Sequence, residues 1–193
     1  MNGASFLVSA GALLLLALAA CMKDQRAQAP AREAPAVAAE VQDTSAPFQG
    51  TLDATRRSGP SPPMAQLRGV RVTADSGFDR MVFEFADSVI PGYLIEYPEG
   101  PIRRCGSGDE VPLAGSGRLL VRLEPAQAHD ERGNSTIPNR GWAPRLPVVR
   151  DIQLVCDFEG QVEWAIGLAE RRRFRVIEMT PSAYLIVDVR HRD

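Results

Sequence analysis

The chain has 193 residues, with 22 Lys and Arg against 24 Asp and Glu and a formal net charge of −2. This balance argues against a nucleic-acid-binding protein, which needs a strong basic excess. The length suits one domain of ordinary size together with flanking segments.

The chain opens with MNGASFLVSAGALLLLALAAC, which contains no charged side chain. Its apolar run, residues 11–20, is far shorter than the roughly 20 residues of a transmembrane helix and suits the h-region of a signal peptide. It ends in Leu18-Ala19-Ala20-Cys21, the leucine, two small residues and cysteine of the bacterial lipobox. We therefore predict a signal peptide over residues 1–20 and lipidation of Cys21. The basic n-region is missing, so an uncleaved anchor or a chance apolar N-terminus are the alternatives.

A lipid on Cys21 would fix the protein to a membrane, and firm anchoring needs more than one acyl chain. Met22 stands where inner-membrane retention signals carry Asp. We therefore predict a cell-envelope location, on the periplasmic side of an outer membrane or the outer leaflet of a plasma membrane.

Residues 21–65 are rich in Ala, Pro, Gln, Ser and Thr and contain few large apolar side chains. Such a segment cannot bury enough surface to offset the entropy of ordering it. We predict a disordered linker that sets the reach of the domain and has no binding role of its own.

From residue 66 onward the sequence alternates apolar and polar residues in short runs separated by turn signals. This pattern predicts one all-β domain over residues 66–193, an antiparallel β-sandwich or barrel of about eight short strands. In the fifth run the alternation places Ile152, Leu154, Cys156 and Phe158 on one face. The Pro-broken span 125–147 is predicted to be a long loop. The predicted strands are residues 67–73, 79–86, 93–97, 118–124, 148–158, 162–168, 174–179 and 184–190.

Four segments carry a family resemblance: GFDRMVFEF (77–85), PGYLIEY (91–97), CDFEGQVEWAIGL (156–168) and YLIVDVRH (184–191). With the segments between them they resemble the AMIN-like domain of bacterial lipoproteins and secreted proteins. More distantly, the chain is similar to the AMIN domain of cell-wall amidases and pilus secretins, a β-sandwich that localises its host by binding peptidoglycan. The resemblance implies a sandwich fold and a non-enzymatic role, but it carries no site residue with it.

Two cysteines, Cys105 and Cys156, remain after the lipobox cysteine. Disulfides persist in exported proteins, so we predict a structural bridge between them. The alternative is two unpaired thiols, with Cys156 acting as a small core residue.

Polar clusters give little sign of chemistry. His129-Asp130-Glu131 is predicted to be a solvated turn, because a zinc site needs three or four suitably spaced ligands. Asp157 and Glu159 flank a probable turn, and alternation would send both carboxylates to solvent. No catalytic motif is present, so we predict no enzyme, no metal and no cofactor.

The candidate ligand-binding residues are Trp142 and the run Arg171, Arg172 and Arg173. Guanidinium groups pair with carboxylates and phosphates, and Trp142 in the long loop is the better candidate for an exposed aromatic than Trp164, which is predicted to lie in the core. The alternative for the arginine run, and the one favoured here, is a solvated hairpin tip.

The sequence therefore predicts a monomeric, membrane-anchored lipoprotein whose β-domain binds peptidoglycan or another wall polymer. A protein-interaction lipoprotein that docks on an envelope assembly machine is the alternative. A third hypothesis is that the protein is an enzyme without a recognisable motif.

Overall fold

The computed structural model describes residues 48–58, 63–86 and 88–192. The predicted signal peptide, Cys21 and most of the predicted linker lie outside these ranges. The described residues contain no helix, and so none long and apolar enough to cross a membrane. The strands are β1 (Thr55–Arg57), β2 (Ala65–Asp75), β3 (Phe78–Phe85), β4 (Gly92–Glu96), β5 (Gly117–Glu124), β6 (Ala126–Gln127), β7 (Gly141–Trp142), β8 (Val149–Phe158), β9 (Gln161–Leu168), β10 (Phe174–Met179) and β11 (Tyr184–Arg190).

All eight predicted strands are present, as β2 to β5 and β8 to β11. The alternation that predicted them is visible in β3, where buried Met81, Phe83 and Phe85 alternate with partly exposed neighbours. Because successive side chains of a strand point to opposite faces, such a strand can bury one face only. The pattern therefore fixes which face of each sheet turns inward.

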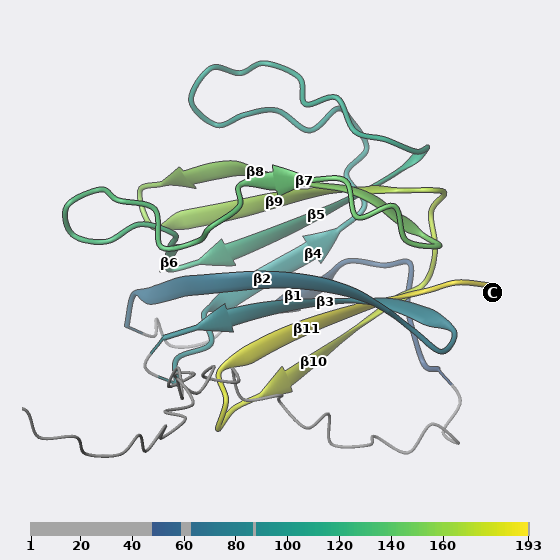
Figure 1. Ribbon diagram of the computed structural model, residues 1–193, viewed down its shortest axis with the longest axis horizontal. Helices are drawn as coiled ribbons and strands as arrows, with labels where there is room; N and C mark the ends of the chain where they lie inside the picture. The colour runs from purple at the N-terminus through teal and green to yellow at the C-terminus, as the bar shows by residue number, and fades with distance from the viewer. Residues whose placement is uncertain (1–47, 59–62, 87, 193) are drawn as a thin grey trace, which may run out of the picture. The chain divides into compact units, whose positions relative to one another are not determined.

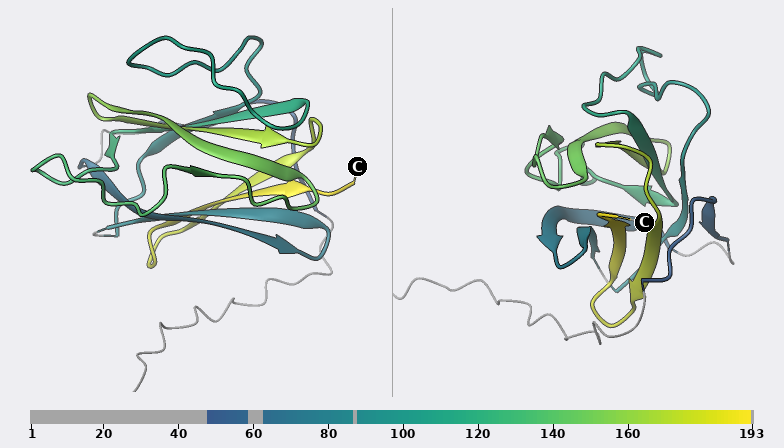
Figure 2. Two further views of the ribbon diagram at one scale, coloured as in Figure 1. Left: turned by 45° about the horizontal axis from the view of Figure 1, so that its top comes forward. Right: turned by 90° about the vertical axis from the view of Figure 1, so that its right-hand side faces the viewer.

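The strands form two sheets packed face to face, with the orders β1-β4-β5-β9-β8-β7 and β10-β11-β3-β2-β6. Figures 1 and 2 show the two layers, which we call sheet 1 and sheet 2 in that order. Every pairing is antiparallel except the short parallel contact of β2 with β6. The predicted all-β sandwich is confirmed.

The main core fills the space between the sheets. Its largest members are Trp164 from sheet 1 and Phe83 and Phe174 from sheet 2, all of them fully buried. The rings of Phe83 and Trp164 meet edge to face, with centroids 6.4 Å apart. Burying one such side chain contributes about 1.5–3 kcal/mol. The predicted core position of Trp164 is confirmed.

A second, smaller core lies on the outer face of sheet 1. There Leu120, Val155 and Ala165 are covered by Ile102 and Val111. Both covering residues belong to the long connection between β4 and β5, residues 97–116, which we call the cover loop. The loop arches over the outer face of sheet 1 in Figure 1. One face of sheet 1 that would otherwise meet water is therefore partly buried.

The β-domain begins earlier than predicted. Thr51 bridges to Phe174, the ring of Phe48 lies 6.1 Å from that of Phe78, and β1 pairs with β4. Residues 48–58 thus belong to the sandwich rather than to the linker. Composition could not reveal this, because these contacts are made mainly by backbone and by one aromatic side chain.

Candidate functional site: a hollow beside the disulfide

The site begins with an irregularity in β8. Between Leu154 and Cys156 the register with β9 shifts by one residue, which makes a β-bulge at Val155. A bulge sends the residues after it to the opposite face from the one that strict alternation predicts. The prediction that the residues from Ile152 to Phe158 with this spacing share one face is therefore wrong. Ile152 and Leu154 face the main core, whereas Cys156 faces outward and Phe158 is 63% exposed.

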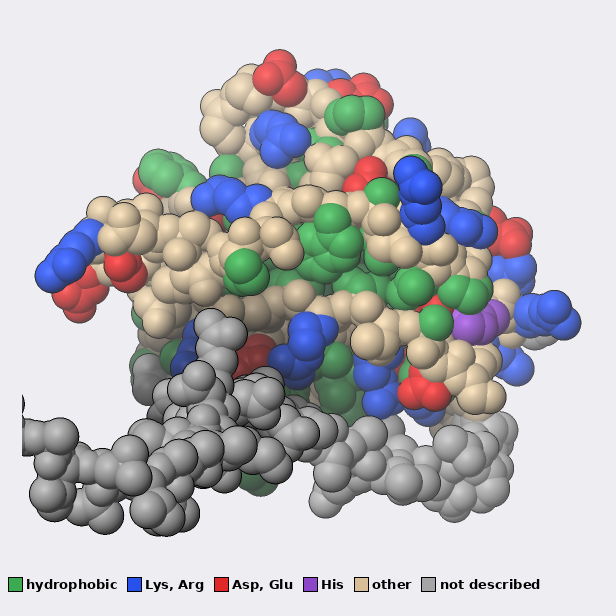
Figure 3. Space-filling view, in the orientation of Figure 1, with side chains coloured by type: hydrophobic (Ala, Val, Ile, Leu, Met, Phe, Trp, Pro, Cys, Tyr) green, Lys and Arg blue, Asp and Glu red, His purple; other side chains and the backbone are tan. Residues whose placement is uncertain are grey.

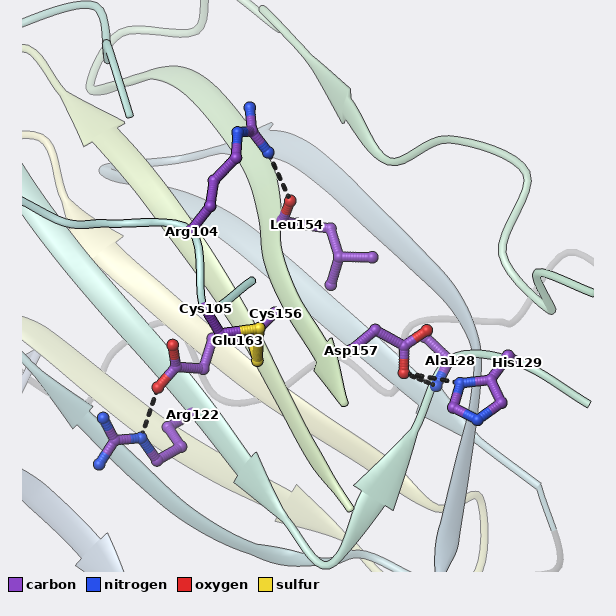
Figure 4. Close-up of a disulfide and its surroundings, with 9 residues drawn as sticks. All are labelled: Arg104, Cys105, Arg122, Ala128, His129, Leu154, Cys156, Asp157 and Glu163. Carbon is purple, nitrogen blue, oxygen red and sulfur yellow. Dashed lines mark hydrogen bonds and ion pairs between the residues drawn. A yellow bond between two sulfur atoms is a disulfide. The ribbon is translucent and has the colours of Figure 1, made fainter. Parts of the chain in front are cut away.

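The outward turn of Cys156 brings it to the cover loop, where it forms a disulfide with Cys105 across a Cα–Cα distance of 5.2 Å. The predicted bridge is confirmed. Two hydrogen bonds support it: the Cys105 amide donates to the Val155 carbonyl (3.2 Å), and Arg104 Nη1 donates to the Leu154 carbonyl (3.5 Å). Figure 4 shows the Arg104 side chain reaching to the Leu154 carbonyl, with the two sulfur atoms further along the strand. The cover loop is thus fixed to β8 at the bulge.

A hollow of about 1000 Å³ lies between the cover loop, β8 and β7. The cover loop contributes Arg104 and Cys105, the segment that enters β7 contributes Arg140 and Trp142, and β8 contributes Gln153 and Phe158. We call this the disulfide hollow. It draws on three segments that are far apart in the sequence, and it depends on the bulge and the disulfide for its shape.

The disulfide hollow combines cations with apolar surface. Arg104 also donates to Gln153 Oε1 (3.3 Å), while the exposed Arg140 makes no ion pair with any described residue. Asp151 and Asp157 line the hollow too. The Asp151 carboxylate accepts hydrogen bonds from the Ala114 amide and from Gln153 Nε2, and that of Asp157 accepts one from the Ala128 amide. Arginines and the exposed Phe158 in one hollow suit an anionic ligand with an apolar face, because guanidinium binds carboxylates bidentately.

Trp142 is partly buried rather than exposed. It lies in β7, pairs with Ile152 and meets Trp164 edge to face, with centroids 6.2 Å apart. The sequence missed this because a two-residue strand leaves no periodic pattern. Trp142 nevertheless lines the disulfide hollow, so its predicted role in ligand binding stays a prediction.

The arginine run lies elsewhere. Residues 171–173 form the connection by which the chain passes from β9 in sheet 1 to β10 in sheet 2, so the favoured prediction of a hairpin tip is wrong. The Arg171 guanidinium stacks on the Tyr97 ring at 4.7 Å, and Arg172 pairs with Glu170. Arg173 Nη1 donates to the Gly50 carbonyl (3.1 Å). The fold does not bring the run together with Trp142, and its role in ligand binding stays a prediction.

The carboxylate of Asp157 is not solvated as predicted, because the bulge turns it inward. Its side chain is 4% exposed, and Oδ1 accepts a hydrogen bond from the Ala128 amide and contacts His129 Nδ1, both at 2.9 Å (Figure 4). Glu159 is exposed at the β8–β9 turn, as predicted. Asp157 therefore fixes the segment that leaves β6 and holds His129 in place.

Asp130 stabilises the next turn. Its carboxylate accepts hydrogen bonds from the side chain and backbone of Asn134 and from the Arg132 amide, and these bonds, led by that of the Asn134 side chain, lower the pKa of Asp130. No group of three metal-ligating side chains occurs among the described residues. The polar cluster at residues 129–131 thus builds a turn.

Two buried carboxylates in sheet 2 were not singled out from the sequence. Asp79 accepts hydrogen bonds from the Val148 and Val149 amides at 2.7 and 2.8 Å and contacts His191 Nε2 at 2.8 Å. Asp188 is fully buried between Arg80 and Arg175. Asp79 shares the inward face of β3 with Met81 and Phe83, so its place in the alternation could have marked it, whereas Asp188 lies at a polar position of β11 and only its partners reveal its role.

The β-sandwich thus carries an open hollow that charged and apolar residues line, which gives a ligand a place to bind. Residues 65–191 match the AMIN-like domain, and the chain belongs to this family. AMIN-like domains are non-catalytic binding modules of the cell wall, which associates the protein with the cell envelope or periplasm. Comparison with curated proteins and with solved structures gave no significant match.

Proposed function

We propose that this protein is a lipid-anchored, non-enzymatic envelope protein whose AMIN-like domain binds peptidoglycan through the disulfide hollow. The family supports a wall-binding role. The observation that carries the choice of site is that Arg104 and Arg140 line the same hollow as Trp142 and Phe158. Peptide stems of the wall offer carboxylates to the guanidinium groups, and sugar rings offer apolar faces to Trp142 and Phe158.

Substitutions at the rim of the hollow should weaken wall binding. We expect Arg140→Gln with Phe158→Ser to lower the retention of the protein on purified sacculi by about tenfold or more. A lost charge-assisted hydrogen bond alone is worth about 1.5–3 kcal/mol. Both side chains are exposed, so folding should be unaffected. The measurement is co-sedimentation with sacculi over a range of wall concentrations.

The matched control is Arg132→Gln with Met64→Ser, which removes one exposed cation and one exposed apolar side chain that do not line the hollow. The control should bind like the native chain. Equal retention of both double variants would rule out the hollow as the site. Retention of the native domain no better than that of an unrelated β-domain would rule out wall binding.

The lipid anchor is supported by the lipobox at residues 18–21. We expect the intact mass of the protein from its native host to correspond to a chain that begins at Cys21 and carries a diacylglyceryl group. The Cys21→Ser chain should lack the added mass and leave the detergent phase. An unmodified N-terminus in the native chain would contradict the anchor.

A protein partner is the second candidate, and the free edge of β2 favours it. β6 covers only Ala65 and Gln66, so residues 68–75 have no strand on that side within the described part of the chain. Such an edge can accept a strand from another protein. Crosslinking from Thr73 to an envelope protein in cells, together with no retention on sacculi, would favour this candidate.

A further inference from the structure

Arginines gather on sheet 2 where the described chain begins. The guanidinium of Arg175 lies 4.7 Å from the centre of the Phe48 ring and 5.1 Å from that of Phe78, and Arg80 lies 5.0 Å from Phe78. Arg190 lies 5.8 Å from the Phe48 ring. Figure 3 shows Lys and Arg side chains concentrated at this end of the molecule, around a histidine. The stacking holds several cations close together against their mutual repulsion.

The carboxylates at this end are fewer than the cations. Asp188 is shared by Arg80 and Arg175, and Asp79 is occupied by two backbone amides and His191. Asp75 accepts a hydrogen bond from the Ser76 amide and lies close enough to Arg80 to raise its pKa, although Asp188 has the larger effect.

The remaining cations have no such partner. Arg173, Arg190 and Arg192 make no ion pair with any described residue. Among the described residues named here, five arginines outnumber three aspartates, although the chain as a whole is slightly acidic.

Arg190 and Arg192 border a hollow of about 670 Å³, whose other lining residues are Gly77, Pro147 and His191. Its shape is fixed by backbone, because the His191 amide donates to the Gly77 carbonyl (2.9 Å) and the Arg190 amide to the Arg173 carbonyl (3.0 Å). Arg190 and Arg192 both line this hollow, and guanidinium groups suit a phosphate group, whose oxygens accept bidentate hydrogen bonds. We call this the arginine hollow.

We propose that the arginine hollow and the neighbouring Arg173 dock on phosphate headgroups of the membrane that holds the protein. The membrane is the chosen occupant because the chain enters the domain at this surface, with Phe48 against Arg175 and Arg190. The predicted anchor, Cys21, precedes Phe48 by 27 positions, a reach of at most about 100 Å. This inference rests on the proposed function only for the lipid anchor at Cys21.

Docking would determine which surface of the domain meets the membrane. A basic surface is attracted to anionic lipid by about 1 kcal/mol for each Arg close to it. The arginine hollow includes the last residues of β11 in sheet 2, whereas the disulfide hollow lies along β8 and the cover loop of sheet 1. A domain seated through its arginines would therefore keep the disulfide hollow available to the wall.

The test uses the chain from Met22 onward, which lacks the lipid but keeps every core residue, since the core runs from Ala65 to Val189. We expect it to sediment with vesicles of equal parts phosphatidylglycerol and phosphatidylcholine, and not with phosphatidylcholine alone. Binding should weaken as salt increases. Arg190→Gln with Arg192→Gln should lower the partition coefficient about 20- to 30-fold.

The matched control, Arg103→Gln with Arg132→Gln, removes the same charge from exposed sites in the cover loop and the turn after β6, and it should bind like the native chain. Arg192→Gln alone changes an exposed residue beyond β11 and keeps the test valid if the double variant unfolds. It should lower the partition coefficient about fivefold.

Equal binding of native chain and variants would overturn the proposal. So would binding to soluble polyphosphate without binding to vesicles, which would assign the site to a phosphate polymer. Loss of sacculus retention by the Gln variants would show that the two hollows form one wall site, whereas intact retention leaves the proposed wall-binding function separate.

Discussion

Replacing Asp79 with alanine is expected to lower the free energy of unfolding by about 3–5 kcal/mol. The carboxylate is fully buried and accepts hydrogen bonds from the Val148 and Val149 amides. Each buried donor left without an acceptor costs about 1–3 kcal/mol, and two donors lose their acceptor at once. His191 would lose its partner as well, which should loosen the C-terminal residues.

Urea unfolding followed by tryptophan fluorescence measures the effect, since Trp164 lies in the main core. Asp79→Asn keeps one carbonyl acceptor and should fall between the native chain and the alanine variant. Asp109→Ala is the control, because Asp109 is exposed on the cover loop, and such surface changes stay within about 0.5 kcal/mol. A loss below about 1 kcal/mol for Asp79→Ala would mean that water replaces the carboxylate.

The strands were predictable because each obeys a local rule. In β3 the alternation of residues reflects burial of one face against the other sheet, whereas in β11 residues 185–189 are buried on both faces. The short strands β1, β6 and β7 follow no such rule. Trp142 belongs to a strand only because β8 passes beside it, and that neighbour is remote in sequence.

The candidate site was predictable only in part, and the bulge at Val155 explains why. The cysteine pairing could be expected from the predicted export of the protein and from the even number of cysteines after Cys21, and it is confirmed. The faces to which the side chains of Cys156, Asp157 and Phe158 point could not be predicted, because one inserted residue reverses the alternation and leaves no sequence signature. Arg171 to Arg173 show the same limit, since their neighbours Leu52 and Gly50 come from the other end of the domain.

Removing the disulfide should have the second large effect. Replacing both Cys105 and Cys156 with serine is expected to lower the free energy of unfolding by about 4 kcal/mol in the chain-entropy account, because the bridge closes a span of 51 positions. The cover loop would lose its covalent attachment to β8. Ile102 and Val111 would then hold the loop only through the smaller core.

The two consequences can be separated by measurement. Urea unfolding reports stability, whereas limited trypsin digestion reports the cover loop, since cleavage after Arg103 and Arg104 should accelerate in the variant and in the reduced native chain. The two serines also remove the disulfide from the lining of the disulfide hollow, so sacculus retention should fall even where the sandwich stays folded. Unchanged stability and unchanged cleavage would show that hydrogen bonds such as that from the Cys105 amide to Val155 fix the loop without the bridge. The disulfide would then matter to the hollow only as part of its surface.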